Sequence, residues 1–249
     1  MSLERPFWFA DTQVVRMARE DAPSRVAVAL FHGFPGQPPR GQESAYLGVP
    51  RLRLVLGEAL AAAGIGVYLP GYEGLGESRG RFGFERSVER SRELALELAG
   101  RHERLHVGGH SWGGFVAFNA HRALGSRAGR LALFAGLLDL PDRESVLRFL
   151  PDYQQKYPEI LGVGPEALAR AVDDLDRARL AYNPITFAEP SPEGALLTVH
   201  GRQDAYVDVE LSRRFHRKAG GRFLEIDDDH LFLQGMPAVV AEAARFLSG

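Results

Sequence analysis

Short apolar segments alternate along the chain with longer segments of helical spacing, and this order restricts the fold more than any other feature. Continuous apolar runs at residues 26–31, 65–69 and 131–135 are typical of strands buried on both faces of a sheet. Further strands are expected at 7–9, 13–18, 105–107, 195–199 and 222–226. Helical spacing is found at 52–63, 84–99, 112–124, 208–218 and 237–247. The repeated order predicts an α/β fold with a mostly parallel central sheet flanked by helices.

Residues 137–194 interrupt this order. Two helical segments, near 144–161 and 165–180, take the place of strands there, and prolines punctuate them. In a chain of 249 residues we therefore expect one α/β core, formed by residues 1–136 and 195–249. The intervening segment is predicted to be a helical lid, inserted after the sixth strand.

The sequence Gly109-His110-Ser111-Trp112-Gly113 matches G-x-S-x-G and lies where a predicted strand meets a helix. Such a motif holds the serine in a strained conformation at a tight turn, and side chains beside it would collide where strand and helix cross. The motif alone is a weak signal, because 28 of the 249 residues are glycine. The motif predicts a nucleophile only if the rest of the chain supplies a base and an acid that can act on Ser111.

Two residues far along the chain are candidate partners of Ser111. A serine hydroxyl is a poor nucleophile at neutral pH and needs a base, which in turn needs an orienting carboxylate. Asp204 and His230 each follow a predicted strand, so they are expected at the same edge of the sheet as Ser111. Asp139 is an alternative acid, and Asp208 is expected to cap the helix that follows it.

Two backbone N–H groups are candidates for stabilising an oxyanion beside Ser111. One belongs to Trp112, the next residue in the chain. The other belongs to Phe34 in the loop after the strand at 26–31, because Pro35 has no N–H. We expect the ring of His32 to hold this loop in place.

Aromatic residues of the predicted lid are candidates for a substrate pocket, and an equal alternative is that they form the lid's own core. They are Phe149, Tyr153, Tyr157 and Tyr182. The lid also carries three acids that we interpret as a solvated helix face: Asp173, Asp174 and Asp176. An aminopeptidase would instead use lid carboxylates to bind the amine of its substrate.

Composition excludes several classes of function. The net charge of -2, with both signs mixed, provides no overall field for nucleic acid or an anionic membrane. The chain has no cysteine, which excludes disulfides, thiolate catalysis and cysteine-bound zinc. Its apolar runs are too short to span a bilayer, and no signal peptide is visible, so a cytoplasmic location is expected. The expected partner is a small-molecule substrate, and the oligomeric state is left open.

The sequence His102-Glu103-Arg104-Leu105-His106 spells the zinc-protease motif H-E-x-x-H, which works only on a helix. Here Gly100 ends the preceding helix and the next strand begins at Leu105. In an extended segment the two histidines would lie more than about 12 Å apart, at roughly 3.3 Å per residue. We therefore expect no metal site.

From about Val26 onward the chain resembles the serine α/β-hydrolases. The segments His32-Gly33-Phe34, Gly74-Leu75-Gly76-Glu77-Ser78-Arg79-Gly80-Arg81-Phe82 and Gly109–Gly113 are similar to the esterase, acylglycerol-lipase and cinnamoyl-esterase-like branch. The resemblance implies hydrolysis of carboxylic esters of small or medium acyl or aromatic acids through an acyl-serine, without a cofactor. The His-Ser-Trp-Gly sequence is also similar to proline iminopeptidases and cofactor-free perhydrolases, and the proline-rich lid matches no substrate-specific pattern.

The same candidate catalytic residues could also serve other reactions, which remain as alternatives. They are aminopeptidase or amidase, thioesterase, perhydrolase and carbon–carbon cleavage. Dehalogenase and epoxide-hydrolase chemistry is disfavoured, because it needs an aspartate where Ser111 stands. An alternative of another class is a ligand-binding protein that keeps the fold without catalysis.

Overall fold

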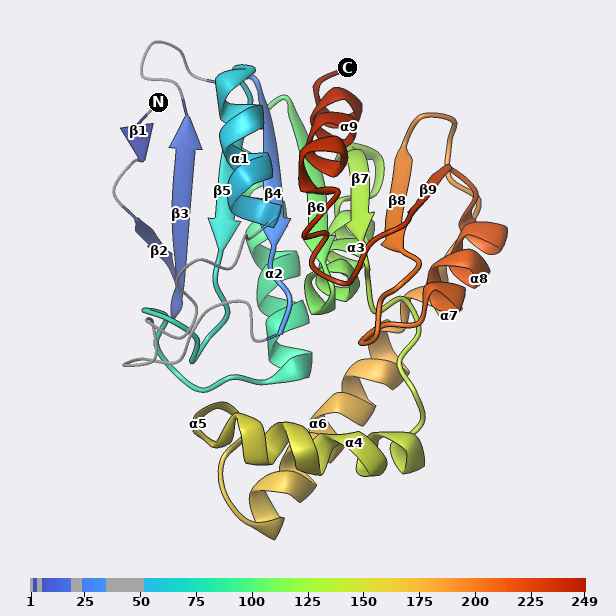
Figure 1. Ribbon diagram of the computed structural model, residues 1–249. Coiled ribbons are helices and arrows are strands. Elements are labelled where there is room, and N and C mark those ends of the chain that lie inside the picture. The colour runs from blue at the N-terminus through green and yellow to red at the C-terminus, as the bar shows by residue number, and fades with distance from the viewer. Residues whose placement is uncertain (1, 4–5, 19–23, 35–51) are drawn as a thin grey trace.

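The computed structural model describes residues 2–3, 6–18, 24–34 and 52–249, and its centre is one nine-stranded sheet (Figure 1). The strand order is β1-β3-β5-β4-β6-β7-β8-β9, with β2 paired to β3. The strands are β1 (Ser2–Leu3), β2 (Phe7–Phe9), β3 (Thr12–Ala18), β4 (Val26–Phe31), β5 (Gly66–Pro70), β6 (Arg104–His110), β7 (Ala128–Phe134), β8 (Leu196–Gly201) and β9 (Arg222–Ile226).

Most of the sheet is parallel, as predicted. Strand β4 pairs in parallel with β5 and β6, and the parallel pairing continues from β6 through β9. Only the first three strands are antiparallel: β3 to β5, and β1 and β2 to β3. The carboxyl ends of the parallel strands consequently meet at one edge of the sheet.

Helices cover both faces of the sheet because each carries one apolar side. Helices α1 (Leu52–Ala62) and α9 (Met236–Ser248) lie together on one face, in front of the sheet in Figure 1. Their buried side chains, such as Leu56 and Val239, form one core with the strands. Helices α2 (Phe84–Ala99), α3 (Trp112–Leu124) and α8 (Val209–Ala219) contribute to the core on the other face. A 3-10 turn at Gly125–Arg127 follows α3.

Four helices replace strands between β7 and β8. They are α4 (Arg143–Lys156), α5 (Pro158–Leu161), α6 (Pro165–Tyr182) and α7 (Pro184–Phe187). Figure 1 shows α4, α5 and α6 below the edge at which the parallel strands end. The predicted helix at 144–161 is wrong as a single element, since the chain breaks at Tyr157 and Pro158 begins a new helix. Proline disfavours helical geometry in the residue before it, and it is well placed at a helix start.

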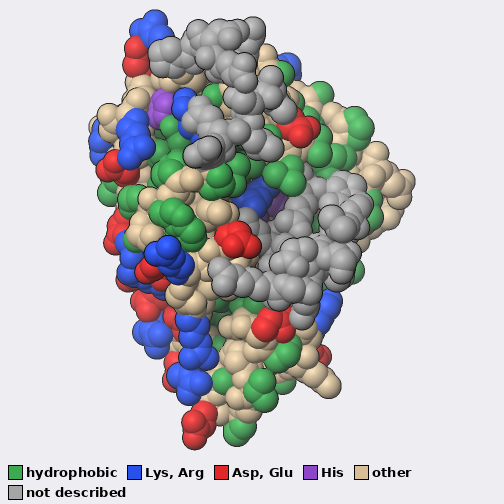
Figure 2. All heavy atoms as spheres, turned by 90° about the vertical axis from the view of Figure 1, so that its left-hand side faces the viewer, with side chains coloured by type: hydrophobic (Ala, Val, Ile, Leu, Met, Phe, Trp, Pro, Cys, Tyr) green, Lys and Arg blue, Asp and Glu red, His purple; other side chains and the backbone are tan. Residues whose placement is uncertain are grey.

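The distribution of charged side chains on the surface is consistent with the small net charge of the chain. On the face that Figure 2 shows, basic and acidic side chains are interspersed. None of the helices within the described ranges is both long and apolar enough to cross a bilayer.

Candidate active site

Ser111 lies at a sharp turn between β6 and α3, and backbone contacts make this turn dependent on glycine. Ser111 has a φ of 57°, which is rare for a residue with a side chain. A Cβ on Gly109 would lie 1.9 Å from the carbonyl oxygen of Gly113, and one on Gly113 would lie 2.3 Å from that of Phe31. The Ser111 N–H donates to the Phe134 carbonyl of β7 at 3.0 Å. The strand and the helix are thus pressed together around the serine.

His230 and Asp204, remote in sequence, are hydrogen-bonded partners. His230 Nδ1 lies 2.6 Å from Asp204 Oδ2. Asp204 Oδ1 accepts the backbone N–H groups of Tyr206 and Val207, both at 2.8 Å. A carboxylate only accepts, so Nδ1 of His230 carries a proton, and in the neutral ring Nε2 keeps its lone pair. This tautomer is the one that a general base at Nε2 requires.

A second histidine, His200, reaches the same carboxylate. Its Nε2 lies 3.1 Å from Asp204 Oδ2 and 2.9 Å from the Val207 carbonyl, and its Nδ1 lies 2.7 Å from Ser212 Oγ. Burial would raise the pKa of Asp204, but hydrogen bonds from His200 and His230 outweigh it and hold that pKa below its usual range. Sequence reasoning found no partner for His200; its place four residues before Asp204, at a strand end, was the available signal.

The loop that carries His230 is braced by the acids before it. The Asp228 carboxylate, 2% exposed, accepts the backbone N–H groups of Asp229 and Gln234. Asp229 Oδ1 accepts the Leu231 N–H at 2.8 Å. These short-range bonds are typical of aspartate in turns, and they fix the backbone on both sides of the imidazole.

His110 connects the serine turn to the histidine loop. Its ring centroid lies 4.7 Å from that of His230, and its Nε2 donates to the His230 carbonyl at 2.8 Å. Burial, and then the neighbouring His230, lowers the pKa of His110 to about 3, so the ring is neutral. Within the described part of the chain no hydrogen bond joins Ser111 Oγ to the His230 ring, although both residues line the same cavity.

Buried neutral histidines predict a loss of stability in mild acid. Burial also lowers the pKa of His106 to about 4, with Arg130 and Arg104 adding to the effect. Below pH about 6.5 the unfolded chain binds protons at His106 and His110 that the folded chain does not. The free energy of unfolding should therefore fall by about 1.4 kcal/mol per pH unit for each histidine as the pH drops from 6.5 toward 4.

Urea denaturation at pH 7, 6 and 5 measures this dependence. His106→Gln keeps an acceptor for the Arg130 N–H, which His106 Nδ1 accepts at 2.7 Å, but cannot titrate. The slope of this variant should be smaller by about 1.4 kcal/mol per pH unit. Equal slopes for the two proteins would show that His106 takes up protons equally in the folded and unfolded states.

The loop before Phe34 runs directly alongside the serine. A Cβ on Gly33 would lie 2.9 Å from Ser111 Cβ, so this contact also needs glycine. The buried Tyr72 hydroxyl donates to the His32 carbonyl at 2.8 Å, and His32 Nδ1 lies 2.7 Å from the Gly33 carbonyl. The Tyr72 hydroxyl and the His32 ring therefore both help to hold this loop in place.

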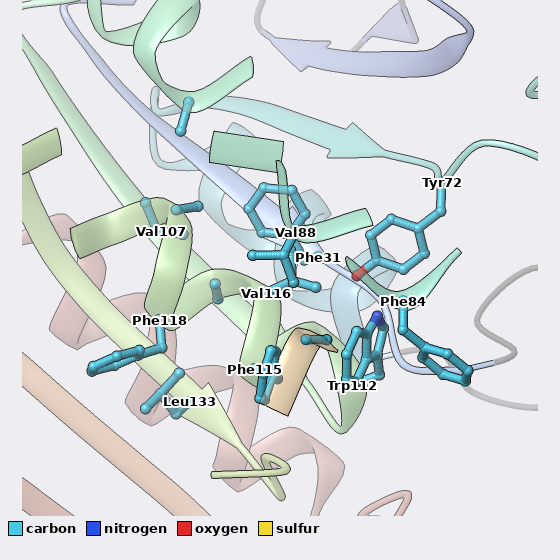
Figure 3. Close-up of a cluster of buried hydrophobic side chains, with 14 of the residues drawn as sticks. Phe31, Tyr72, Phe84, Val88, Val107, Trp112, Phe115, Val116, Phe118 and Leu133 are labelled. Atoms are coloured by element: carbon cyan, nitrogen blue, oxygen red, sulfur yellow. The ribbon is translucent and has the colours of Figure 1, made fainter. Parts of the chain in front are cut away.

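The second candidate donor, the Trp112 N–H, belongs to the first residue of α3, where backbone N–H groups have no partner within the helix. The Trp112 ring is fixed between two phenylalanines (Figure 3), with centroid distances of 4.7 Å to Phe115 and 5.2 Å to Phe84. Its Nε1 donates to Ser87 Oγ at 3.1 Å. The start of α3 is thus anchored in the core.

A cavity of about 1190 Å³ lies between the strand ends and the inserted helices, and both Ser111 and His230 line it. Phe149, Tyr153 and Tyr157 also line it. Tyr182 does not: its carbonyl accepts from Asn119 of α3 and its ring lies 5.3 Å from the Arg92 guanidinium of α2. As the last residue of α6, Tyr182 is held against the core helices, so its prediction as a substrate-binding residue is corrected.

The alternative acid and the predicted helix cap have other partners. Asp139 accepts from Asn183 Nδ2 at 2.8 Å and from Arg214 at 2.6 Å. Asp208 caps α8, as predicted, by accepting the Glu210 N–H at 2.9 Å. The structure therefore brings Asp204, and not Asp139, to His230.

The residues of the zinc-like motif do not converge. His102 lies in a turn, where its ring contacts Tyr68 Oη and the Ser24 carbonyl, both at 2.8 Å. His106 lies within β6. Among the described residues no group of three or more histidine, aspartate or glutamate side chains is placed to hold a metal ion.

A mostly parallel sheet with a serine at a strand–helix turn, and an Asp–His pair at the same sheet edge, defines the class of α/β hydrolases. A family model confirms this: the chain belongs to the alpha/beta hydrolase family, whose model matches residues 28–243. The family and its structural neighbours support a hydrolase.

Solved structures show the same fold at low sequence identity. The chain is similar to Est1E from Butyrivibrio proteoclasticus with ferulic acid bound, at 17% identity and a TM-score of 0.69, over 95% of this chain and 94% of that one. It is similar to a monoacylglycerol lipase from Paleococcus ferrophilus at 20% identity and a TM-score of 0.63, over 96% of this chain and 99% of that one. It is also similar to a thioesterase domain from the curacin biosynthetic pathway, at 14% identity and a TM-score of 0.62, over 100% of both chains. No curated protein matches the sequence.

Proposed function

We propose that the protein is a serine hydrolase that cleaves carboxylic esters through an acyl-serine intermediate. Ser111 is the nucleophile, His230 the general base and Asp204 the carboxylate that orients it. The observation that carries the proposal is the 2.6 Å bond from His230 Nδ1 to Asp204, in the wall of a cavity that also contains Ser111. The esterase and lipase among the structural neighbours support it further.

In the first half of the reaction, His230 Nε2 takes the proton of Ser111 as Oγ attacks the ester carbonyl carbon. The hydroxyl and the ring have to come within hydrogen-bond distance for this step, which many enzymes reach only when substrate is bound. The backbone N–H groups of Phe34 and Trp112 hold the oxyanion. The alcohol then leaves with the proton from His230.

In the second half, water replaces the alcohol. His230 takes a proton from the water, the resulting hydroxide attacks the acyl carbon, and Ser111 recovers its proton as the acid departs. Asp204 keeps the proton on Nδ1 throughout and stabilises the charged imidazole. The helical segment 137–194 is proposed to act as a lid on a core formed by 1–136 and 195–249, with Phe149, Tyr153 and Tyr157 contacting the substrate.

Ion pairs in the inserted helices favour an ester over an aminoacyl substrate. The acids that could bind a substrate amine each pair with an arginine: Asp173 with Arg143, Asp174 with Arg177 and Asp176 with Arg179. In the cavity wall, Asp139 pairs with Arg214 and Asp208 caps α8. Of the two carboxylates in the described part of the wall, one is thus neutralised by an arginine and the other is engaged at a helix start.

A substrate panel tests this proposal. We expect 4-nitrophenyl butyrate to be hydrolysed with a kcat/KM roughly 100-fold or more above that of alanine and proline 4-nitroanilides, because an unpaired buried charge costs several kcal/mol. A fluorophosphonate probe should label Ser111, as seen by peptide mass spectrometry. Faster turnover of the aminoacyl amides would favour an aminopeptidase, and absence of both labelling and turnover would favour a non-catalytic protein.

A further inference from the structure

Among the described residues of the cavity wall, the charged side chains leave one positive charge in excess. Three of these residues are cations, Arg53, Lys156 and Arg214, and two are anions, Asp139 and Asp208. Asp139 and Arg214 neutralise each other at 2.6 Å, and Arg53 donates to the Pro70 carbonyl at 2.9 Å. Asp208 is occupied at the start of α8. Lys156 is the cation to which the described residues provide neither a carboxylate nor a backbone carbonyl.

Lys156 is set apart from the other lysine and from the arginines. The chain has only two lysines, and Lys218 is bound by the carbonyls of Ile185 and Thr186 at 2.7 and 3.1 Å. Lys156 ends α4, and among the described residues no carboxylate lies within ion-pair distance of it. Its Nζ instead lies 5.3 Å from the ring centroid of Tyr157. A hydrogen bond with Tyr157 raises the pKa of Lys156, so the amine stays charged.

Three tyrosines line the same cavity as this amine. Tyr153 and Tyr157 line the cavity one turn apart, with ring centroids 6.0 Å from each other. Tyr206 also lines it, and its ring lies 5.4 Å from that of His230. A phenol can donate a hydrogen bond to an anion that an ammonium attracts. The lysine and these tyrosines together therefore offer charge and donors to one anionic group.

An aromatic wall connects this cationic end to the serine. Phe34 follows Gly33, which packs against Ser111, and its ring centroid lies 6.2 Å from that of Tyr153 and 6.1 Å from that of Tyr157. A substrate with an apolar body can lie along this wall with its ester at one end. The other end then faces Lys156.

We propose that the site selects esters that carry a carboxylate or another anionic group at the end remote from the scissile bond, and that Lys156 binds this group. The inference rests on the proposed ester hydrolysis and names its substrate class. The anion can belong to the acid or to the alcohol part of the ester, since the chemistry that recognises it is the same.

Matched substrates test the acid part. Mono-4-nitrophenyl esters of succinic to suberic acid carry a distal carboxylate, and 4-nitrophenyl alkanoates of equal chain length do not. At the chain length that reaches Lys156, the anionic ester should have a kcat/KM roughly 10-fold or more above its neutral partner, as expected for one charge-assisted contact. The alcohol part is tested in the same way with 3- and 4-carboxyphenyl butyrates against phenyl butyrate.

Lys156→Met should reduce the anionic-to-neutral ratio to about 1 or below, because the attracting charge is gone. Lys218→Met is the matched control and should keep the ratio of the unmodified protein. Added NaCl should lower the ratio in the unmodified protein and not in Lys156→Met. A ratio at or below 1 for every substrate pair, or an equal ratio in Lys156→Met, would overturn the proposal.

Binding separates this inference from the proposed reaction. Calorimetric titration of Ser111→Ala with the same anionic and neutral esters should show tighter binding of the anionic one, and Lys156→Met in that background should remove the difference. If esters are turned over without anionic preference, only the present inference fails. If no ester is hydrolysed, ester hydrolysis fails, and the titration still decides whether Lys156 binds an anion.

Discussion

Replacing Ser111 with alanine should lower the kcat of ester hydrolysis by about 10⁴-fold or more, because no other group at the turn can form the acyl intermediate. The fold should be unaffected. The backbone bond from residue 111 to the Phe134 carbonyl does not use the side chain, and alanine removes only one oxygen from a site that is 9% exposed.

The measurement is steady-state hydrolysis of 4-nitrophenyl butyrate, with urea denaturation to compare stability. Ser248→Ala, in the exposed last turn of α9, is the matched control and should retain full activity. Turnover of Ser111→Ala within about 10-fold of the unmodified protein would assign the nucleophile elsewhere.

Asp204→Asn should be the second most damaging change, with a loss in kcat of about 10³–10⁴-fold. Both oxygens of Asp204 accept hydrogen bonds: Oδ1 from two backbone N–H groups, Oδ2 from His230 and His200. An amide has one oxygen, so its NH₂ must face donors on one side. The side with His230 can adapt by moving the ring proton to Nε2, which removes the general base.

Nitrogen-15 NMR of the histidine rings would report that change of tautomer directly, beside the loss of kcat. Asp139→Asn is the matched control, because it replaces the other candidate acid of the cavity wall. We expect it to cost less than about 10-fold in kcat, since Asp139 contacts Arg214 and Asn183 rather than His230. A larger loss from Asp139→Asn than from Asp204→Asn would reverse the assignment of the acid.

The main architecture could be predicted because local and global preferences agree there. Buried strands such as Val26–Phe31 are continuous apolar runs, and parallel order follows from the helices between them. Ser111 could be singled out since its glycines have a steric purpose that the structure confirms at Gly109 and Gly113. Asp204 was distinguished from Asp139 by its chain position, and the structure brings it to His230.

Features that depend on packing between distant segments could not be predicted. Nothing in the pattern around Tyr182 indicates that α6 ends against α2 and α3 rather than over the cavity. The same holds for His200, whose bonds to Asp204 and Ser212 join β8 to α8. The excess charge of Lys156 is also a property of which carboxylates lie nearby, and composition alone shows a nearly neutral chain.

The placement of the inserted helices has a consequence for how this protein can change. Every group assigned to bond breaking lies on the sheet edge, whereas α4 and the residue after it supply Phe149, Tyr153, Lys156 and Tyr157 to the wall. Under the proposed function, a large part of the substrate-contacting wall thus lies on a different stretch of chain from the reacting groups. We therefore expect a mutant library confined to α4 through α6 to change which esters the proposed hydrolase accepts while the reacting groups keep their positions.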